Sequence, residues 1–167
     1  ETTGANLQKF LAQGFNGDMG WLADTAMRRL QPVAMWPDAT TAIVLTMNYG
    51  PDHNPMDNLR HPDRGNISVY ARGRDYHDVI KGKLKQLASQ FAARSKANVK
   101  VFVDTAPLME KPLAAQAGAG WQGKHTNLVS RSAGSWLFLG TILTDANVPA
   151  DMPEPDHCGG CTRCLDI

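Results

Sequence analysis

The sequence lacks the features of a membrane protein and of a strongly basic nucleic-acid binder. Its longest apolar runs, such as residues 42–45 and 136–139, are far shorter than the roughly 20 residues that a membrane-spanning helix needs. Seventeen lysines and arginines against sixteen aspartates and glutamates leave a net charge of +1. The short apolar runs therefore predict no membrane span. Because the charge balance creates no strong positive field, any contact with RNA must be local.

Cysteine is also scarce, and its distribution excludes a secreted disulfide scaffold. All three cysteines lie between Cys158 and Cys164, and an odd, clustered set cannot form the spread-out framework of a small extracellular domain. This pattern favours metal binding in a cytoplasmic protein. With 43% hydrophobic residues in a chain of 167, the composition suits one compact domain with a core and argues against disorder.

The distribution of apolar residues predicts alternating helices and strands. Helices are expected as two short ones between residues 6 and 27, a long one from an Asp75 cap to about residue 91, and a short one at 110–117. Strands are expected at 41–47 and 99–103, and at 127–130 and 135–143 as an antiparallel pair joined by a turn at 132–134. This alternation indicates an α/β layered domain with a mixed sheet.

Two segments are predicted to lack regular structure. Residues 51–65 contain three prolines and no periodicity, which indicates a long loop, and loops of this length are often functional. After Asp145 the sequence becomes proline-rich and acidic, which is typical of a linker. We therefore predict one domain at 1–148, followed at 149–167 by a linker and the start of a cysteine-containing domain.

The segment Gly118–Lys124 matches two nucleotide-binding patterns, G-x-G-x-x-G and G-x-x-x-x-G-K, but in the wrong context. A dinucleotide fingerprint follows a strand and opens a helix, whereas this segment follows a helical pattern and precedes a strand. A phosphate loop needs Ser or Thr after the lysine, where His125 stands. What remains is a turn whose glycines allow close approach of the backbone to another group, beside the polar run Lys124–Asn127. A solvated turn without a ligand is the alternative.

Asp104 directly follows the apolar strand predicted at 99–103 and precedes Thr105 and a proline. A strand end delivers a side chain to the edge of a sheet, which is a favoured place for a catalytic acid. An Asx-type cap of the following turn explains the same residue equally well. To donate a proton at neutral pH, this carboxyl group would need burial or an anionic neighbour.

The segment Tyr70–His77 gathers two arginines, two tyrosines and a histidine within eight residues. Guanidinium groups suit the recognition of phosphate or carboxylate. A helix start with exposed flanking residues explains the same pattern without any ligand.

The cysteines form the pattern C-x2-C-x2-C, the first three positions of the iron–sulfur run C-x2-C-x2-C-x3-C-P. The next cysteine would fall at position 168, one beyond Ile167, so we expect the sequence to be truncated within this motif. A cluster would then need a further cysteine from outside the sequence. The alternative is a zinc site formed by His157 and the three thiolates, although zinc sites usually draw paired ligands from two separated loops.

Taken together, four stretches of this chain closely resemble the epoxyqueuosine reductase family: 103–113, 117–128, 134–140 and 156–164. The upstream segments 17–20, 47–49 and 70–77 also fit, so the resemblance covers nearly the whole chain. It implies a corrinoid-binding, nitroreductase-like α/β domain followed by the start of a ferredoxin-like segment. It also implies an oxidoreductase that uses cobalamin and two [4Fe-4S] clusters to reduce the epoxide of epoxyqueuosine in tRNA, the last step of queuosine synthesis.

The resemblance implies a role for each candidate site residue. Asp104 would donate the proton and contact the cofactor, Lys124, His125 and Asn127 would belong to the cobalamin-contacting loop, Arg29 would lie at the cofactor's periphery, and Cys158, Cys161 and Cys164 would bind the first cluster. The implied partners are tRNA carrying epoxyqueuosine and an external electron donor, and a monomer is expected. Since the other cluster ligands and the family's helical tRNA-binding tail are missing, we expect this piece to bind cobalamin and to be inactive alone.

The sequence leaves two other classes of function open. One is a corrinoid iron–sulfur reductase of a different substrate, similar to a reductive dehalogenase, because cofactor machinery does not fix the substrate. The other is a zinc-stapled RNA-binding module that uses Arg72 and Arg74 and binds no corrinoid. Corrinoid absorption bands would favour the first class, and a colourless protein with stoichiometric zinc would favour the second.

Overall fold

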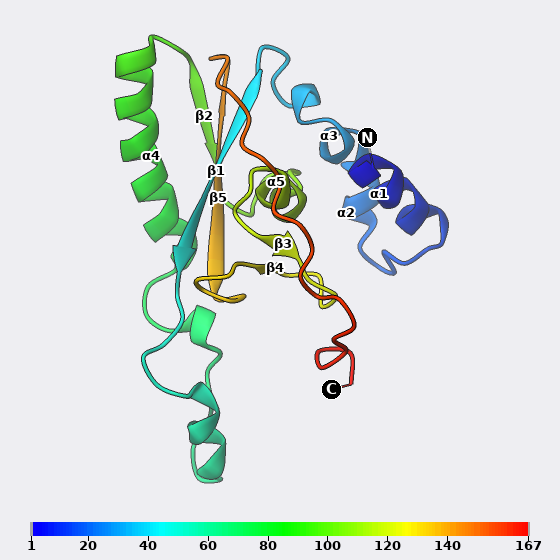
Figure 1. The fold of residues 1–167 in the computed structure, drawn as a ribbon, viewed down its shortest axis with the longest axis vertical. Coiled ribbons are helices and arrows are strands. Elements are labelled where there is room, and N and C mark those ends of the chain that lie inside the picture. Colours follow the sequence, from blue (N-terminus) through cyan, green and yellow to red (C-terminus); the bar gives the residue numbers. More distant parts are fainter. Residues whose placement is uncertain (1, 167) are drawn as a thin grey trace.

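The structure, a computed structural model, describes residues 2–166 and has three layers (Figure 1). A three-stranded sheet forms the middle layer, helix α4 covers one face, and helix α5 with the N-terminal helices lies on the other. The helices are α1 (Thr2–Ala12), α2 (Gly20–Asp24), α3 (Ala26–Leu30), α4 (Tyr76–Ser95) and α5 (Glu110–Gln116). The strands are β1 (Thr41–Asn48), β2 (Val99–Phe102), β3 (Trp121–Gln122), β4 (Leu128–Val129) and β5 (Leu137–Thr144).

The main sheet has the strand order β1-β5-β2, and both pairings are antiparallel. The prediction of an α/β layered domain is confirmed, but the prediction of a mixed sheet is wrong. The last strand, β5, inserts between the two earlier ones, and its residues 140–144 are fully buried. Because β1 and β2 flank β5 without touching each other, their shared direction produces no parallel ladder.

The predicted antiparallel pair of 127–130 with 135–143 is also wrong. β4 pairs with β3, from within the glycine-rich segment, while the turn at 132–134 closes only a single bridge between Ser130 and Gly134. β5 instead pairs along its whole length with β1. Residues 141–144 of β5 are buried, and there β1 and β2 supply a ladder on each edge of the strand, which satisfies its backbone groups.

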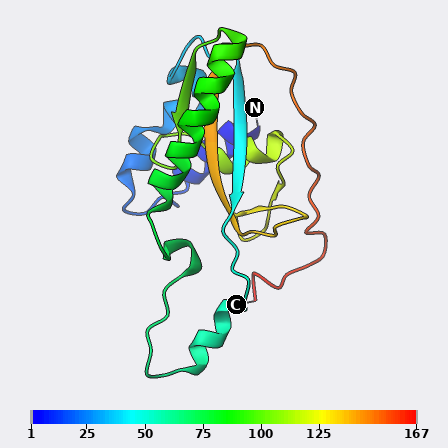
Figure 2. The same cartoon turned by 90° about the vertical axis from the view of Figure 1, so that its left-hand side faces the viewer.

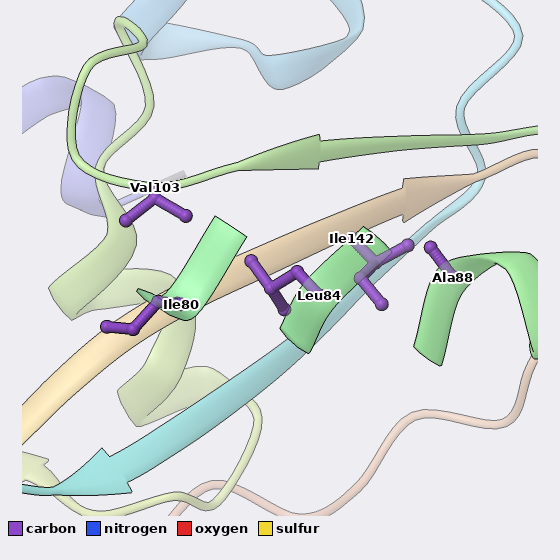
Figure 3. Close-up of a cluster of buried hydrophobic side chains, with 5 residues drawn as sticks. All are labelled: Ile80, Leu84, Ala88, Val103 and Ile142. Atoms are coloured by element: carbon purple, nitrogen blue, oxygen red, sulfur yellow. The ribbon is translucent and has the colours of Figure 1, made fainter. Parts of the chain in front are cut away.

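The core lies between α4 and the sheet. Ile80, Leu84 and Ala88 recur every four residues on one side of α4 and pack against Val103 and Ile142 (Figure 3). Each of these five side chains is at most 5% exposed. This packing fixes where α4 begins, and therefore where the residues at its N-terminus lie relative to the sheet.

Helix α4 begins and ends on local signals. The Asp75 side chain accepts a hydrogen bond from the backbone N–H of His77 at 2.9 Å, as the predicted cap requires. The helix runs four residues beyond its predicted end, to Ser95, and stops where Lys96 adopts a left-handed conformation. The predicted short helix at 110–117 is confirmed as α5, but the N-terminal region forms three helices where two were expected.

Residues 51–74 form an arm that extends away from the sheet between β1 and α4 (Figure 2). The predicted long loop is confirmed here, with two short 3-10 turns at Pro55–Arg60 and Val69–Ala71. After β5, residues 145–166 run past α5 and β3 without forming a helix or strand. No helix among residues 2–166 combines the length and apolar character needed to cross a membrane.

Candidate functional site

A cleft of about 540 Å³ opens on the α5 side of the sheet. Leucine, phenylalanine and tryptophan side chains form much of its lining, and polar groups complete it. The apolar lining includes Leu108, Leu128, Trp136, Leu137, Phe138 and Leu139, and the polar lining includes Tyr49, Tyr76, Asp104, Glu110, Lys111, Gln122 and Asn127. This hollow combines apolar surface with a few convergent polar groups, which is typical of a small-molecule site.

Asp104 lies at the cleft, directly after β2, as its place in the sequence predicts. Its backbone adopts the left-handed region with φ of 52°, which few residues other than glycine and asparagine or aspartate adopt. The Asp104 N–H donates to Oε2 of Glu110 at 3.1 Å, and the Tyr76 hydroxyl donates to Oδ2 of Asp104 at 2.7 Å. The backbone and the side chain of Asp104 are therefore each held by a neighbouring element.

His77 links Asp104 to the start of α4. Its Nδ1 lies 2.7 Å from Oδ1 of Asp75, and its Nε2 lies 3.4 Å from Oδ2 of Asp104. The hydrogen bond to Asp75 raises the pKa of His77 above its ordinary value. Burial, together with the hydrogen bond to Asp104, raises the pKa of Tyr76. Both hydrogen-bonding side chains around Asp104 thus keep their protons to a higher pH than they would in water.

Glu110, the first residue of α5, is a half-buried residue beside this cluster whose Oε1 is shielded from solvent. Its Oε2 accepts from Asp104, whereas its Oε1 is buried without a hydrogen-bond partner among the described residues. Burial raises the pKa of Glu110 to about 7. A group that changes charge near neutral pH therefore contacts the backbone of Asp104.

Aromatic rings form a continuous stack along one side of the cleft. Tyr49 stacks on Phe138 at 4.2 Å between ring centroids, Phe138 on Tyr76 at 4.2 Å, and Tyr76 on His77 at 4.0 Å. Trp136 packs on Tyr49 in a T-shaped arrangement, with the ring centroids 5.6 Å apart. The stack joins β1, β5 and α4, so the Tyr76 hydroxyl that contacts Asp104 is held by the packing of the sheet.

The structure brings Asn127 to the cleft with Asp104 but places the other loop candidates elsewhere. Asn127 lines the cleft and its Oδ1 accepts from Lys111 Nζ at 2.8 Å. His125 folds back on its own turn, where its Nδ1 accepts from the Asn127 N–H at 3.1 Å. Lys124 Nζ donates to the backbone carbonyls of Gly159 and Cys161, both at 2.9 Å. Lys124 therefore contacts the cysteine segment.

Arg29 lines a separate hollow of about 510 Å³ between the N-terminal helices and α5. Its Nε donates to Oγ1 of Thr25 at 3.1 Å, and its guanidinium lies 5.1 Å from the centroid of the Trp21 ring. Partial burial lowers the pKa of Arg29. Met109 and Pro112 line both this hollow and the cleft, so the two are neighbours across the start of α5.

The glycines of the 118–123 segment approach the protein's own backbone. A Cβ atom on Gly118, which has φ of 72°, would lie 2.6 Å from the Met152 carbonyl oxygen. A Cβ atom on Gly120 would collide with the Val129 carbonyl oxygen. These two glycines therefore allow the turn to pack against β4 and the C-terminal segment, and their role is explained without a ligand.

The cysteine segment packs beside β3. Cys158 Sγ accepts a hydrogen bond from the Trp121 indole at 3.4 Å, and the Cys161 N–H donates to the Cys158 carbonyl at 2.9 Å. All three cysteines are free thiols. Among residues 2–166, no three His, Cys, Asp or Glu side chains converge as the ligands of one metal ion. The set of cluster ligands stays a prediction.

No local pattern in the sequence marks Glu110, Lys111 or the aromatic stack as parts of a site. Glu110 follows Asp104 by six residues and stands at the start of a predicted helix. Acidic residues are common there because they interact favourably with the helix dipole, so its position gives no sign of a functional role. The stack assembles from β1, β5 and α4, which no local pattern connects. Tyr76 and His77 did stand out, because their segment concentrates polar and aromatic side chains.

The fold and the cleft define an α/β domain with a cluster of ionisable side chains at one end of its sheet, an arrangement typical of enzymes. Comparisons with known proteins narrow this class. A family model described as "Epoxyqueuosine reductase QueG, DUF1730" matches residues 29–105. An epoxyqueuosine reductase of Xanthomonas campestris is 42% identical over 166 residues, which cover 98% of this chain and 47% of that protein. The Escherichia coli enzyme of the same name is 39% identical over 163 residues, or 96% of this chain and 43% of that protein.

Solved structures agree with the sequence comparisons. The structure of epoxyqueuosine reductase from Streptococcus thermophilus matches with a TM-score of 0.73 at 31% identity, over 84% of this chain and 38% of that one. An epoxyqueuosine reductase crystallised with an epoxyqueuosine-modified tRNA-Tyr stem loop matches with a TM-score of 0.78 at 25% identity, over 97% of this chain and 44% of that one. These matches confirm the resemblance of this chain to the epoxyqueuosine reductase family. The chain spans about half the length of the curated relatives it matches.

Proposed function

We propose that this chain is the cobalamin-binding part of an enzyme that reduces the epoxide of epoxyqueuosine in tRNA to the alkene of queuosine. The observation that carries the proposal is the Asp104 cluster: a carboxyl group fixed at a partly apolar cleft by Tyr76, His77 and Glu110. Opening an epoxide leaves an oxyanion that needs a proton, and a positioned acid accelerates such a step by typically 10²–10⁴-fold. The names of the relatives support the same reaction.

The side chains of the cleft suit a large, flat cofactor with amide groups at its edge. Leucine and aromatic side chains offer apolar surface, while Lys111, Gln122 and Asn127 offer hydrogen bonds. Both Oε1 of the buried Glu110 and Oδ1 of Asp104 have no hydrogen-bond partner among residues 2–166. When bound, a corrinoid would supply the electrons for the reduction.

The cysteine segment suits part of an iron–sulfur site by the chemistry of its donors. Cys158, Cys161 and Cys164 provide three thiols at the required spacing, and Lys124 and Trp121 hold the segment against β3. A [4Fe-4S] cluster there would pass electrons from an external donor towards the cleft. A zinc site at the same thiols would require His157 Nε2 to exchange its contacts with Glu154, at 2.7 Å, and Arg131, at 2.8 Å, for the metal.

The contacts of Asp104 assign different tasks to its two carboxyl oxygens. Oδ2 accepts from Tyr76 and lies close to His77, so this oxygen is occupied. Oδ1 is the oxygen that can present a proton to a substrate in the cleft. Tyr76 and His77 orient the carboxyl group, and Glu110 holds its backbone in the left-handed conformation. After the proton is given up, the two hydrogen-bond donors stabilise the remaining carboxylate.

The proposal is tested by anaerobic titration of the chain with cobalamin, followed by absorption and by calorimetry, with ATP and NADH as competitors. We expect cobalamin to bind and the nucleotides not to bind. Asn127→Ala, in the cleft, should weaken cobalamin binding, whereas Asn66→Ala, on the arm, should not. Micromolar binding of a nucleotide without binding of cobalamin would overturn the proposal.

A further inference from the structure

Besides the cleft and the hollow lined by Arg29, a hollow of about 440 Å³ lies between the arm and the start of α4, and we term it the second hollow. Its residues come from the end of β1, from the arm and from α4, and they combine aromatic with positively charged groups. The lining includes Met47, Tyr49, Asp52, His53, Tyr70, Arg72, Arg74, Tyr76 and Phe138. Nothing in the proposed reduction uses this hollow or its two arginines.

The second hollow and the cleft share three side chains. Tyr49, Tyr76 and Phe138, which form the ring stack, line both. Helix α5 and β4 complete the cleft, whereas the arm completes the second hollow. A ligand in the second hollow would therefore contact the same rings as a ligand in the cleft, including the Tyr76 ring whose hydroxyl holds Asp104.

The two arginines differ in how they are held. The Arg72 Nε donates to the Ile67 carbonyl at 3.0 Å and its Nη2 to Asn66 Oδ1 at 3.2 Å, so Arg72 braces the arm. Arg74 makes no hydrogen bond or ion pair within residues 2–166, and its guanidinium is available. Asp52 supplies a negative charge to the same hollow, against the two arginines and His53.

Tyr70 supplies an aromatic surface that the protein does not use. It is 53% exposed and stacks on no other ring in the described part of the chain, unlike Tyr49 and Tyr76. A base can stack on such a ring whatever its sequence. A free guanidinium beside an unused aromatic ring matches a phosphate and a base of one nucleotide.

We propose that this hollow binds a nucleotide that neighbours the modified nucleotide in the RNA strand, with its base on Tyr70 and its phosphate at Arg74. The inference rests on the proposed function, because it places the modified nucleotide in the cleft. RNA is favoured over a protein partner because Tyr70 and Arg74 offer one contact for a base and one for a phosphate, in a hollow that shares three lining side chains with the cleft. The nearly neutral chain makes such a local contact necessary for RNA binding.

The experiment measures binding of a fluorescent RNA anticodon stem loop to the 167-residue chain as a function of salt. Arg74→Met removes one phosphate contact and should lower the slope of log K against log salt by about 0.7, with weaker binding at every salt concentration. Tyr70→Leu should weaken binding about fivefold or more without changing the slope. Arg60→Met is the matched control, since Arg60 lies on the same arm, outside the hollow and 81% exposed.

A second measurement locates the contact. A 4-thiouridine placed next to the modified position should cross-link to the peptide that contains Tyr70. Three results would each overturn the inference. The first is unchanged affinity and slope in both variants, the second is an Arg60→Met control that binds as weakly as Arg74→Met, and the third is no RNA binding at low salt. Cobalamin binding is measured in the same samples and separates the two hypotheses. If the chain does not bind cobalamin, the proposed function is contradicted. If it binds cobalamin but the Arg74 and Tyr70 variants bind RNA normally, only the proposed nucleotide site is contradicted.

Discussion

The buried carboxyl group of Glu110 should make the stability of this domain fall as the pH rises from about 5 to 8. Burial raises the pKa of Glu110 from 4.5 to about 7 in the folded state, so between these values the folded state binds more protons than the unfolded state. Stability is therefore highest below pH 4.5 with respect to this group and is lost as Glu110 ionises. A difference of one in pKa corresponds to about 1.4 kcal/mol, which makes the loss at pH 8 about 3 kcal/mol.

The assay is urea denaturation of the chain and of Glu110→Gln at pH 5 and pH 8. The amide keeps the shape and can still accept from the Asp104 N–H, but it does not ionise. Part of the loss has already occurred at pH 5, so the variant should lose about 2.5 kcal/mol less than the wild type between the two pH values. Any cost of the buried amide itself cancels, because that cost is the same at both pH values.

A matched control uses a carboxyl group whose pKa is shifted the other way. Hydrogen bonds from His157 and Arg131 lower the pKa of the half-buried Glu154, so Glu154→Gln should not reduce the pH dependence. If Glu110→Gln showed the same change in stability between pH 5 and pH 8 as the wild type, Glu110 would not be buried as described. Its contact with Asp104 would then need another explanation.

Four further predictions follow from the core, the glycine turn, the cleft and the cysteine segment. Leu84→Ala should destabilise the domain by about 3 kcal/mol, because Leu84 is 2% exposed under the sheet, whereas Leu87→Ala on the exposed side of α4 should cost much less in the same urea titration. Gly118→Ala should lower the free energy of unfolding more than Gly14→Ala, since both positions have positive φ but only at Gly118 would the new Cβ meet a carbonyl oxygen. That oxygen belongs to Met152, so Gly118→Ala should also expose residues 151–153 to proteolysis. Equal losses of stability in the two variants would contradict this. Asp104→Asn is best tested in a chimera in which this chain replaces the matching half of the Xanthomonas campestris relative. The variant should still bind cobalamin, but its rate of epoxide reduction in single-turnover measurements should fall by about 10²–10⁴-fold. A near-normal rate would show that Asp104 serves only the turn. Anaerobic reconstitution of the chain should leave it without a stable [4Fe-4S] cluster, and an iron and sulfide analysis that found about four irons per chain would refute this.

The sequence by itself determined the elements whose signals are local. The Asp75 cap and the apolar spacing of Ile80, Leu84 and Ala88 specify α4, because capping and helical periodicity act within a few residues. The β-branched run of β1 and the regular spacing of the cysteines are visible for the same reason. Asp104 stood out because a polar residue directly follows an apolar strand.

Only the tertiary structure decided which elements meet. The partner of β5 could not be read from its own sequence, since the choice between β4 and β1 depends on burying both of its faces and both of its edges. The contact of Lys124 with the carbonyls of Gly159 and Cys161 joins residues more than thirty positions apart. Likewise, the environment of Asp104 arises where β2, α4 and α5 converge. Hydrogen bonds and burial between distant segments carry no local pattern, because any polar or apolar residue of suitable size could supply them until the chain has packed.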